Sequence, residues 1–114
     1  MPLLKIQTNQ SLDSERRARL LEAASRDLAE ILGKPERYVM VILECNPDMR
    51  FAGSDDPLAY LELKSIGLPE GRTTELSQAL CGLIGKHAGV PAERIYIEFS
   101  DAARHLWGWN GGTF

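Results

Sequence analysis

The feature of this sequence that most constrains its fold is an internal repeat, because two halves of the chain follow the same order of strand, helix and strand. The repeats run from about residue 2 to 46 and from about 58 to 100. Aliphatic and aromatic runs mark the strands, and apolar residues three and four positions apart mark the helices. The expected elements are, in chain order, residues 3–8, about 11–32, 38–43, 58–63, about 73–87 and 95–99.

The joint between each helix and the following strand repeats as well. Gly33 and Gly89 end the two helical patterns, and Pro35 and Pro91 each stand two positions later. Glycine accepts the left-handed conformation that ends many helices, and proline cannot continue a helix. The two joints align at an offset of about 56 residues. Each half therefore predicts a β-α-β unit.

Two such units predict an α+β fold with pseudo-twofold symmetry. Parallel strands in a β-α-β unit cross over right-handedly, so two units can pair into one four-stranded sheet with both helices on one face. At 114 residues, 44% of them hydrophobic, we expect a single domain spanning residues 1–114. The other sheet face would expose apolar side chains, and a homo-oligomer is the simplest cover. The residues expected on that face are Val39, Val41, Leu43, Tyr60 and Ile95, or their neighbours along the strands.

Charge and composition exclude several classes of function. The formal net charge is −3, whereas proteins that bind nucleic acid concentrate Lys and Arg. No apolar run reaches the length of a membrane span or a secretory signal. We therefore expect no nucleic acid and no membrane as partners, and a cytoplasmic location that leaves non-classical secretion open. Cys45 and Cys81 lack further ligands at metal-binding spacing, so we expect two buried thiols and no metal.

Pro2 directly follows Met1 and is the candidate catalytic residue. Removal of Met1 would leave a secondary amine, whereas its retention would keep the same nitrogen as an amide. An α-amino group has a pKa of about 7.7 to 8.0, and an apolar pocket or nearby cations would bring that pKa towards neutrality. Pro2 would then suit general base catalysis. The structural alternative is a proline at the start of an edge strand, which is ordinary.

A series of short motifs runs along the whole chain. They are Met1-Pro2, Thr8-Asn9, Gly33-Lys34-Pro35 with Tyr38, Ser65-Ile66-Gly67, Leu80-Cys81-Gly82-Leu83, Arg94-Ile95-Tyr96-Ile97, and Gly108-Trp109-Asn110 with Thr113-Phe114. No single motif is decisive. Together, in their order and spacing, they resemble the macrophage migration inhibitory factor branch of the tautomerase superfamily.

The resemblance implies an assembly and an activity. It implies a homotrimer whose sheets line a central barrel, with three active sites at the subunit interfaces. It also implies keto-enol tautomerization of α-keto acids such as phenylpyruvate, and of a dopachrome-like test substrate, without a cofactor. In such an enzyme Pro2 would accept and return the transferred proton.

The resemblance further implies the substrate-binding residues. Lys34, aided by the backbone N–H of Ile66, would bind the substrate carboxylate, and Tyr96 would donate its phenol from a neighbouring subunit. The aromatic residues implied around the substrate are Tyr38, Trp107, Trp109 and Phe114. Each residue has a structural alternative: Lys34 suits a helix C-terminus, Ile66 and Tyr96 suit strand packing, and the other aromatics suit a core or an interface.

Three departures from the mammalian pattern qualify that activity. Glu98 replaces an asparagine near the pocket, and its carboxylate disfavours an anionic substrate unless it is paired or turned away. Trp107 replaces a smaller valine at the pocket mouth. Leu58 and Leu61 replace a Cys-x-x-Cys motif, so thiol oxidoreductase activity is not expected. The alternative function is a trimeric binding or signalling protein with a weak or vestigial tautomerase site.

Overall fold

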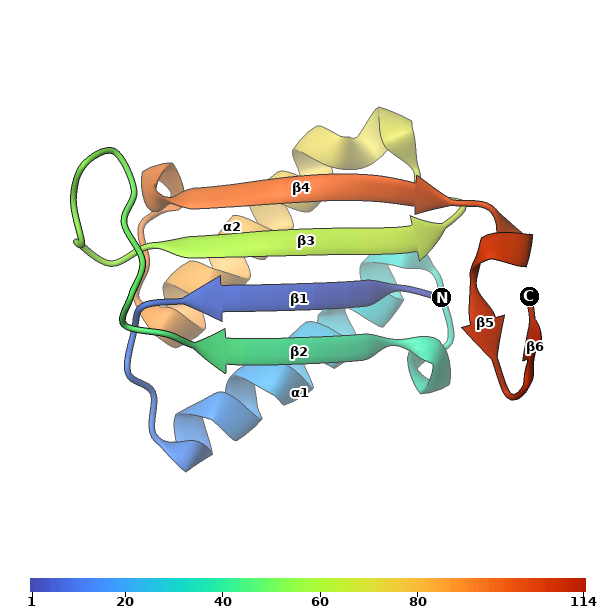
Figure 1. Cartoon of the computed structure of the whole chain (residues 1–114), viewed down its shortest axis with the longest axis horizontal. Coiled ribbons are helices and arrows are strands. Elements are labelled where there is room, and N and C mark those ends of the chain that lie inside the picture. Colours follow the sequence, from blue (N-terminus) through green and yellow to red (C-terminus); the bar gives the residue numbers. More distant parts are fainter.

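Each half of the chain folds into a β-α-β unit in the computed structural model, which describes residues 1–114 (Figure 1). A short hairpin follows the second unit. The first unit consists of β1 (Leu3–Thr8), α1 (Ser14–Leu32) and β2 (Met40–Cys45). The second consists of β3 (Ala59–Ile66), α2 (Thr73–Ala88) and β4 (Ile95–Ala102), and the hairpin of β5 (Gly108–Trp109) and β6 (Gly112–Thr113).

The four long strands form one mixed sheet in the order β2-β1-β3-β4. The strands within each unit are parallel, and the two units meet where β1 runs antiparallel to β3. Both helices cover the same face of the sheet (Figure 1). This arrangement confirms the predicted α+β fold of two pseudo-twofold β-α-β repeats.

Local capping explains where the elements differ from the expected bounds. α1 begins at Ser14 rather than near residue 11, because the Asp13 side chain accepts a hydrogen bond from the Arg16 N–H at 2.8 Å. It ends at Gly33, which has a φ of 63° and suits the left-handed cap. β2 begins at Met40 rather than at residue 38, because Glu36–Tyr38 forms a 3₁₀ turn.

The core lies between the sheet and the two helices. Alternate residues of the central strands β1 and β3 point into it, and they meet one apolar stripe of each helix. Its largest fully buried aliphatic side chains are Leu4, Ile6, Leu20, Leu61, Leu63, Leu76, Ile84 and Val90. Neither helix has the length and apolar character that a membrane span requires.

The face of the sheet away from the helices leaves large apolar side chains exposed, as the sequence predicted. Of the five residues named from the sequence, only Tyr60 lies on this open face, because side chains alternate faces along a strand. Val39, Val41, Leu43 and Ile95 pack against or within the core. Their strand neighbours Met40, Ile42 and Tyr96 are exposed instead, at 60%, 37% and 65%. The open face of the two central strands carries Leu3, Lys5, Gln7, Tyr60, Glu62 and Lys64.

Both cysteines are free thiols, but neither is buried as expected. Cys45 is exposed at the end of β2, which is an edge strand of the sheet. Cys81 is half-buried on α2, at the margin of the core. The prediction of burial was therefore wrong for Cys45 and only partly right for Cys81.

Candidate active site

A cleft of about 270 Å³ opens where the N-terminus meets the C-terminal hairpin. Figure 1 places both chain ends and the β5–β6 hairpin at the same end of the sheet. The hairpin turns tightly because Asn110 and Gly111 have φ values of 51° and 77°, as a two-residue Asn-Gly turn requires. This N-terminal cleft is lined by Met1, Pro2, Leu3, Arg37, Tyr38, Val39, Met40, Trp107, Gly108, Trp109 and Phe114.

Pro2 is held rigidly at the base of this cleft. Its side chain is fully buried, and its carbonyl oxygen accepts a hydrogen bond from the Met40 N–H at 3.0 Å. Proline has no N–H to contribute to a strand ladder, and this bond uses only its carbonyl group. The position of Pro2 is therefore fixed by the sheet rather than by a mobile chain end.

The free amino group of the chain lies beside two cations. Partial burial lowers the pKa of the Met1 amino group, and the charges of Lys34 and then Arg104 lower it further. Both causes disfavour the ammonium form, because burial removes hydration and like charges repel. This end of the sheet therefore favours a neutral amine.

Lys34 and Ile66 lie close to this amine. Lys34 directly follows the helix cap, and its Nζ lies 3.9 Å from the point where a Cβ on Gly67 would stand. Ile66 precedes Gly67 at the end of β3. Because Leu3 pairs with Lys64 in antiparallel register, residues 1 and 2 continue alongside residues 65 and 66. The fold thus brings Lys34 and Ile66 near Pro2, although neither of them lines the cleft.

Three aromatic rings pack together at the mouth of the N-terminal cleft. Tyr38 meets Trp109 and Phe114 edge-on, at centroid distances of 5.6 and 5.8 Å. Trp109 stacks on Phe114 at 5.4 Å. Trp107 lines the same cleft, and its carbonyl oxygen accepts a hydrogen bond from the Phe114 N–H at 3.2 Å. All four predicted aromatic residues therefore lie at this site.

Tyr96 lies far from the cleft within a single chain. It lies at the start of β4, where it pairs with Tyr60, and Tyr60 pairs with Gln7 of β1. Gln7 is five residues beyond Pro2, and at about 3.3 Å per residue this separation is about 16 Å along the strand. The Tyr96 side chain is 65% exposed. Within one chain, Tyr96 is too far from Pro2 to share a substrate with it.

Glu98 lies two residues beyond Tyr96 and is held by a neighbouring hydroxyl. Tyr60 Oη stands 3.1 Å from a carboxylate oxygen of Glu98 and 3.1 Å from one of Glu62. Partial burial, followed by the hydrogen bonds with Glu98 and Glu62, raises the pKa of Tyr60 to about 12. The Tyr60 hydroxyl therefore stays protonated and hydrogen-bonds to the carboxyl group of Glu98.

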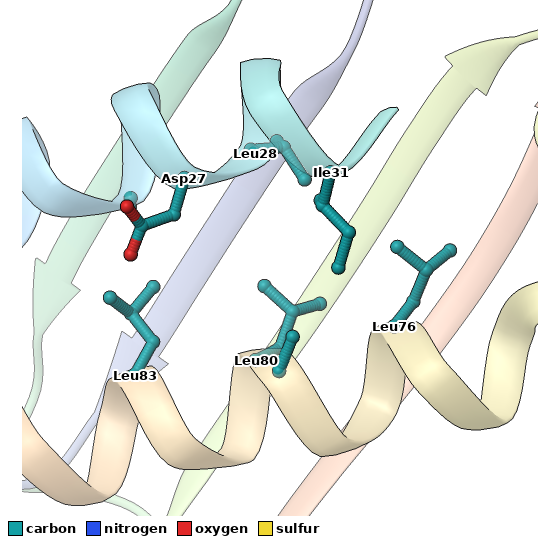
Figure 2. A pocket seen from close by; sticks show the side chains of 8 residues that line it. Asp27, Leu28, Ile31, Leu76, Leu80 and Leu83 are labelled. Carbon is teal, nitrogen blue, oxygen red and sulfur yellow. The ribbon is translucent and has the colours of Figure 1, made fainter. Parts of the chain in front are cut away.

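A second, smaller cavity of about 80 Å³ lies between the two helices. Figure 2 shows Leu76, Leu80 and Leu83 of α2 pointing towards α1 across this gap. Asp27 is the one ionisable residue in its lining. The cavity lacks the polar groups that orient a substrate, and it is best described as a gap in helix packing.

Two cations of this region were not found from the sequence. Arg104, shortly after β4, is close enough to lower the pKa of the terminal amine. Arg37 lines the cleft with its guanidinium 4.7 Å from the centre of the Tyr38 ring. The predicted topology could have indicated that Arg104 lies near the N-terminus, because the end of β4 and the beginning of β1 must lie at the same end of such a sheet.

Comparisons with known proteins cover the whole chain. The family model described as macrophage migration inhibitory factor (MIF) matches residues 1–114. The macrophage migration inhibitory factor of Meriones unguiculatus is 36% identical, covering 100% of this chain and 99% of that protein. The homolog from Brugia malayi is 37% identical with the same coverage. The crystal structure of the homologue from Prochlorococcus marinus has a TM-score of 0.92 and 48% identity, covering 98% of each chain.

Proposed function

From its membership of the macrophage migration inhibitory factor family, in the tautomerase superfamily, we propose that this chain is a keto-enol tautomerase of phenylpyruvate-like α-keto acids. Dopachrome-like compounds are the second substrate class that the family suggests. The observation that carries the proposal is the N-terminal cleft, where a buried Pro2 lies beside an amine with a lowered pKa, a lysine and a cluster of aromatic rings.

Removal of Met1 would transfer the free amine to Pro2. The causes that lower the pKa of the Met1 amine are burial and the charges of Lys34 and Arg104, and they would act on Pro2 at the same end of the sheet. A base whose pKa lies near the working pH is half deprotonated and still accepts a proton readily. Pro2 is the residue that we assign as general base and acid.

Lys34 and the aromatic rings provide complementary contacts for an aryl α-keto acid. The ammonium of Lys34 would pair with the carboxylate, aided by the backbone N–H of Ile66. The substrate ring would pack among Tyr38, Trp109 and Phe114. The cleft of about 270 Å³ is slightly below the size range of small-molecule pockets, about 300 to 1,000 Å³. A neighbouring subunit would complete its walls.

Tyr96 would complete the site from that neighbouring subunit. Its distance from Pro2 within one chain and its exposed ring support this arrangement. The family is typically homotrimeric, and we propose a homotrimer with three shared sites. The phenol would donate a hydrogen bond to the substrate oxygen, where negative charge develops during the reaction.

The proposed reaction moves one proton and needs no cofactor. In the ketone-to-enol direction the Pro2 amine takes a proton from C3. The C–H electron pair becomes the C2=C3 double bond, and the carbonyl π pair moves to oxygen. The Pro2 ammonium then gives up its proton and that oxygen gains one, so the amine is restored and the net change is one proton moved from carbon to oxygen. The reverse direction returns the proton to C3 from the Pro2 ammonium.

The alternative function is a trimeric binding or signalling protein with a vestigial site. The feature that favours it is Glu98, because the carboxylate lies two residues from Tyr96 and would repel an anionic substrate. This alternative predicts a stable trimer that turns over no α-keto acid even after Met1 has been removed.

The deciding experiment combines intact mass with enzyme kinetics. Mass spectrometry identifies protein without Met1, and loss of the enol absorbance of phenylpyruvate measures turnover. Pro2→Ala and a preparation that retains Met1 should each lower kcat/KM by roughly 10²-fold or more, because the first replaces the secondary amine of Pro2 with a primary amine and the second converts it to an amide. Pro47→Ala, in an exposed loop, is the matched control and should keep full activity. Equal activity in all four proteins would exclude Pro2 as the base.

A further inference from the structure

The Arg94 side chain makes four hydrogen bonds to the loop that joins β2 to β3. Its Nη1 donates to the carbonyl oxygen of Phe51 at 2.7 Å, and its Nη2 to those of Ser54 and Asp56 at 3.1 and 3.0 Å. Its Nε donates to the carbonyl oxygen of Pro57 at 3.3 Å. The guanidinium also lies 5.0 Å from the centre of the Phe51 ring. The rigid fork of arginine can serve several acceptors in one plane, which a lysine cannot do.

The segment held by Arg94 includes a strained turn. Phe51 and Ser54 exchange two backbone hydrogen bonds, of 2.9 and 3.0 Å, around Ala52 and Gly53. Ala52 has a φ of 53°, a left-handed conformation that is unfavourable for a residue with a Cβ. Such strain persists where the surrounding structure enforces it, and it is more frequent at functional sites. The hydrogen bonds from Arg94 to the Phe51 and Ser54 carbonyl oxygens restrain both ends of this turn.

The turn places Phe51 against Tyr96. The two rings have a centroid distance of 4.5 Å and an interplanar angle of 42°. Tyr96 remains 65% exposed, so the Phe51 ring is the principal restraint on a side chain that otherwise faces solvent. Figure 1 places this loop and the start of β4 at the end of the sheet opposite the N-terminus.

We propose that Arg94 is a positioning residue for Tyr96. It fixes the backbone of residues 51–57, this backbone fixes the Phe51 ring, and the ring fixes the orientation in which Tyr96 presents its phenol to the neighbouring subunit's cleft. The proposal rests on the proposed function, because it requires Tyr96 to act in that cleft. Arg94 itself contacts no substrate.

The loop offers a way to separate positioning from stability. Asn9 holds the base of the loop independently, with its Nδ2 donating to the Asp55 carbonyl oxygen at 2.9 Å. Its Oδ1 accepts from the Leu58 N–H at 3.0 Å. Arg94→Lys should therefore fold, while losing the fork that serves four carbonyl groups. Arg50→Gln is the matched control, because Arg50 donates one hydrogen bond to the same turn, to the Gly53 carbonyl oxygen at 2.8 Å, and none to the four carbonyl groups that Arg94 serves.

The experiment is a double-mutant cycle on kcat. Tyr96→Phe should lower kcat by roughly 10²-fold, as expected for the loss of a donor to the reacting oxygen. Arg94→Lys should lower kcat by roughly 10- to 100-fold, with KM changed less, because a small misplacement of a catalytic group is costly. Arg94→Lys in the Tyr96→Phe background should cause almost no further loss, because the two residues act through one contact. Arg50→Gln should leave kcat unchanged.

Multiplicative losses in the double variant, or a full kcat in Arg94→Lys, would overturn the positioning role. A second measurement does not depend on turnover: the ring resonances of Tyr96, which are shifted by the Phe51 ring, should move in Arg94→Lys and stay unchanged in Arg50→Gln. If the parent protein has no tautomerase activity, the proposed function fails and these resonances still report whether Arg94 orders Tyr96. Unchanged resonances in Arg94→Lys would refute the relay itself.

Discussion

Replacing Lys34 by Met would remove the ammonium that acts on the terminal amine and keep most of the apolar length of the side chain. A charge-assisted hydrogen bond contributes about 1.5 to 3 kcal/mol. Lys34 is only half-buried, so solvent screening favours the lower end of this range. At about 1.4 kcal/mol per tenfold change, we expect kcat/KM for phenylpyruvate to fall roughly 10- to 30-fold.

The same substitution should move the pH dependence in a definite direction. The general base works in its deprotonated form, and the charge of Lys34 lowers the pKa of the terminal amine. Removing that charge raises the amine pKa, so the acidic limb of the kcat/KM profile should shift to higher pH. Arg104→Gln should shift it in the same direction by less, because Arg104 is the weaker of the two charge effects. Burial, the largest cause, remains in both variants.

The assay compares phenylpyruvate with its methyl ester across pH, with Met1-free protein confirmed by mass. Lys34→Met should lower kcat/KM for the acid but not for the ester at a pH well above the amine pKa. The shift of the acidic limb should appear with both substrates, because it belongs to the enzyme. Equal losses for acid and ester at high pH would refute carboxylate binding by Lys34. An unshifted limb would refute its effect on the base.

Three further outcomes are expected. Glu98→Gln should raise affinity for anionic substrates, measured as a lower KM for phenylpyruvate. It should also lower the pKa of Tyr60, because the hydrogen bond with Glu98 helps to raise that pKa; ultraviolet titration of the phenol measures this shift. Cys45→Ser and Cys81→Ser should leave turnover intact, whereas Cys81→Ser should lower the melting temperature because its half-buried hydroxyl needs a partner. Leu20→Ala should reduce the free energy of unfolding by about 2 to 5 kcal/mol in denaturant titration, because Leu20 is fully buried.

The sequence was sufficient for the fold because each element carries a local signal. The repeated Gly-x-Pro joints after the helices fixed where both crossovers end, and the helical period of α1 and α2 fixed which stripe faces the sheet. No local signal of this kind shows which face of the sheet each strand residue occupies. Val41 and Tyr60 are both apolar enough for either face, and only the register places Val41 with the core and Tyr60 outside.

The candidate site could be predicted where its residues meet through the topology of one chain. Pro2, Lys34 and Ile66 converge because β1 and β3 are antiparallel neighbours and α1 returns to the same end of the sheet. Arg104 was missed because its segment after β4 has no helical or strand period. Its approach to the amine is a consequence of where β4 ends, which no local pattern reports.

The placement of Tyr96 follows from the repeat and bears on the assembly. At the repeat offset of about 56 residues, Pro2 and Met40 of the N-terminal cleft correspond to Leu58 and Tyr96. These two residues line another hollow, at the opposite end of the sheet and separate from the cavity between the helices. The N-terminal amine therefore lies at one hollow, and the phenol of Tyr96 lies at the pseudo-symmetric counterpart of that hollow. A contact that joins unlike ends of identical chains is head-to-tail, and such contacts close into rings when the rotation allows. A closed ring would give every cleft its own tyrosine, whereas a face-to-face dimer of like ends would join cleft to cleft and leave both without one.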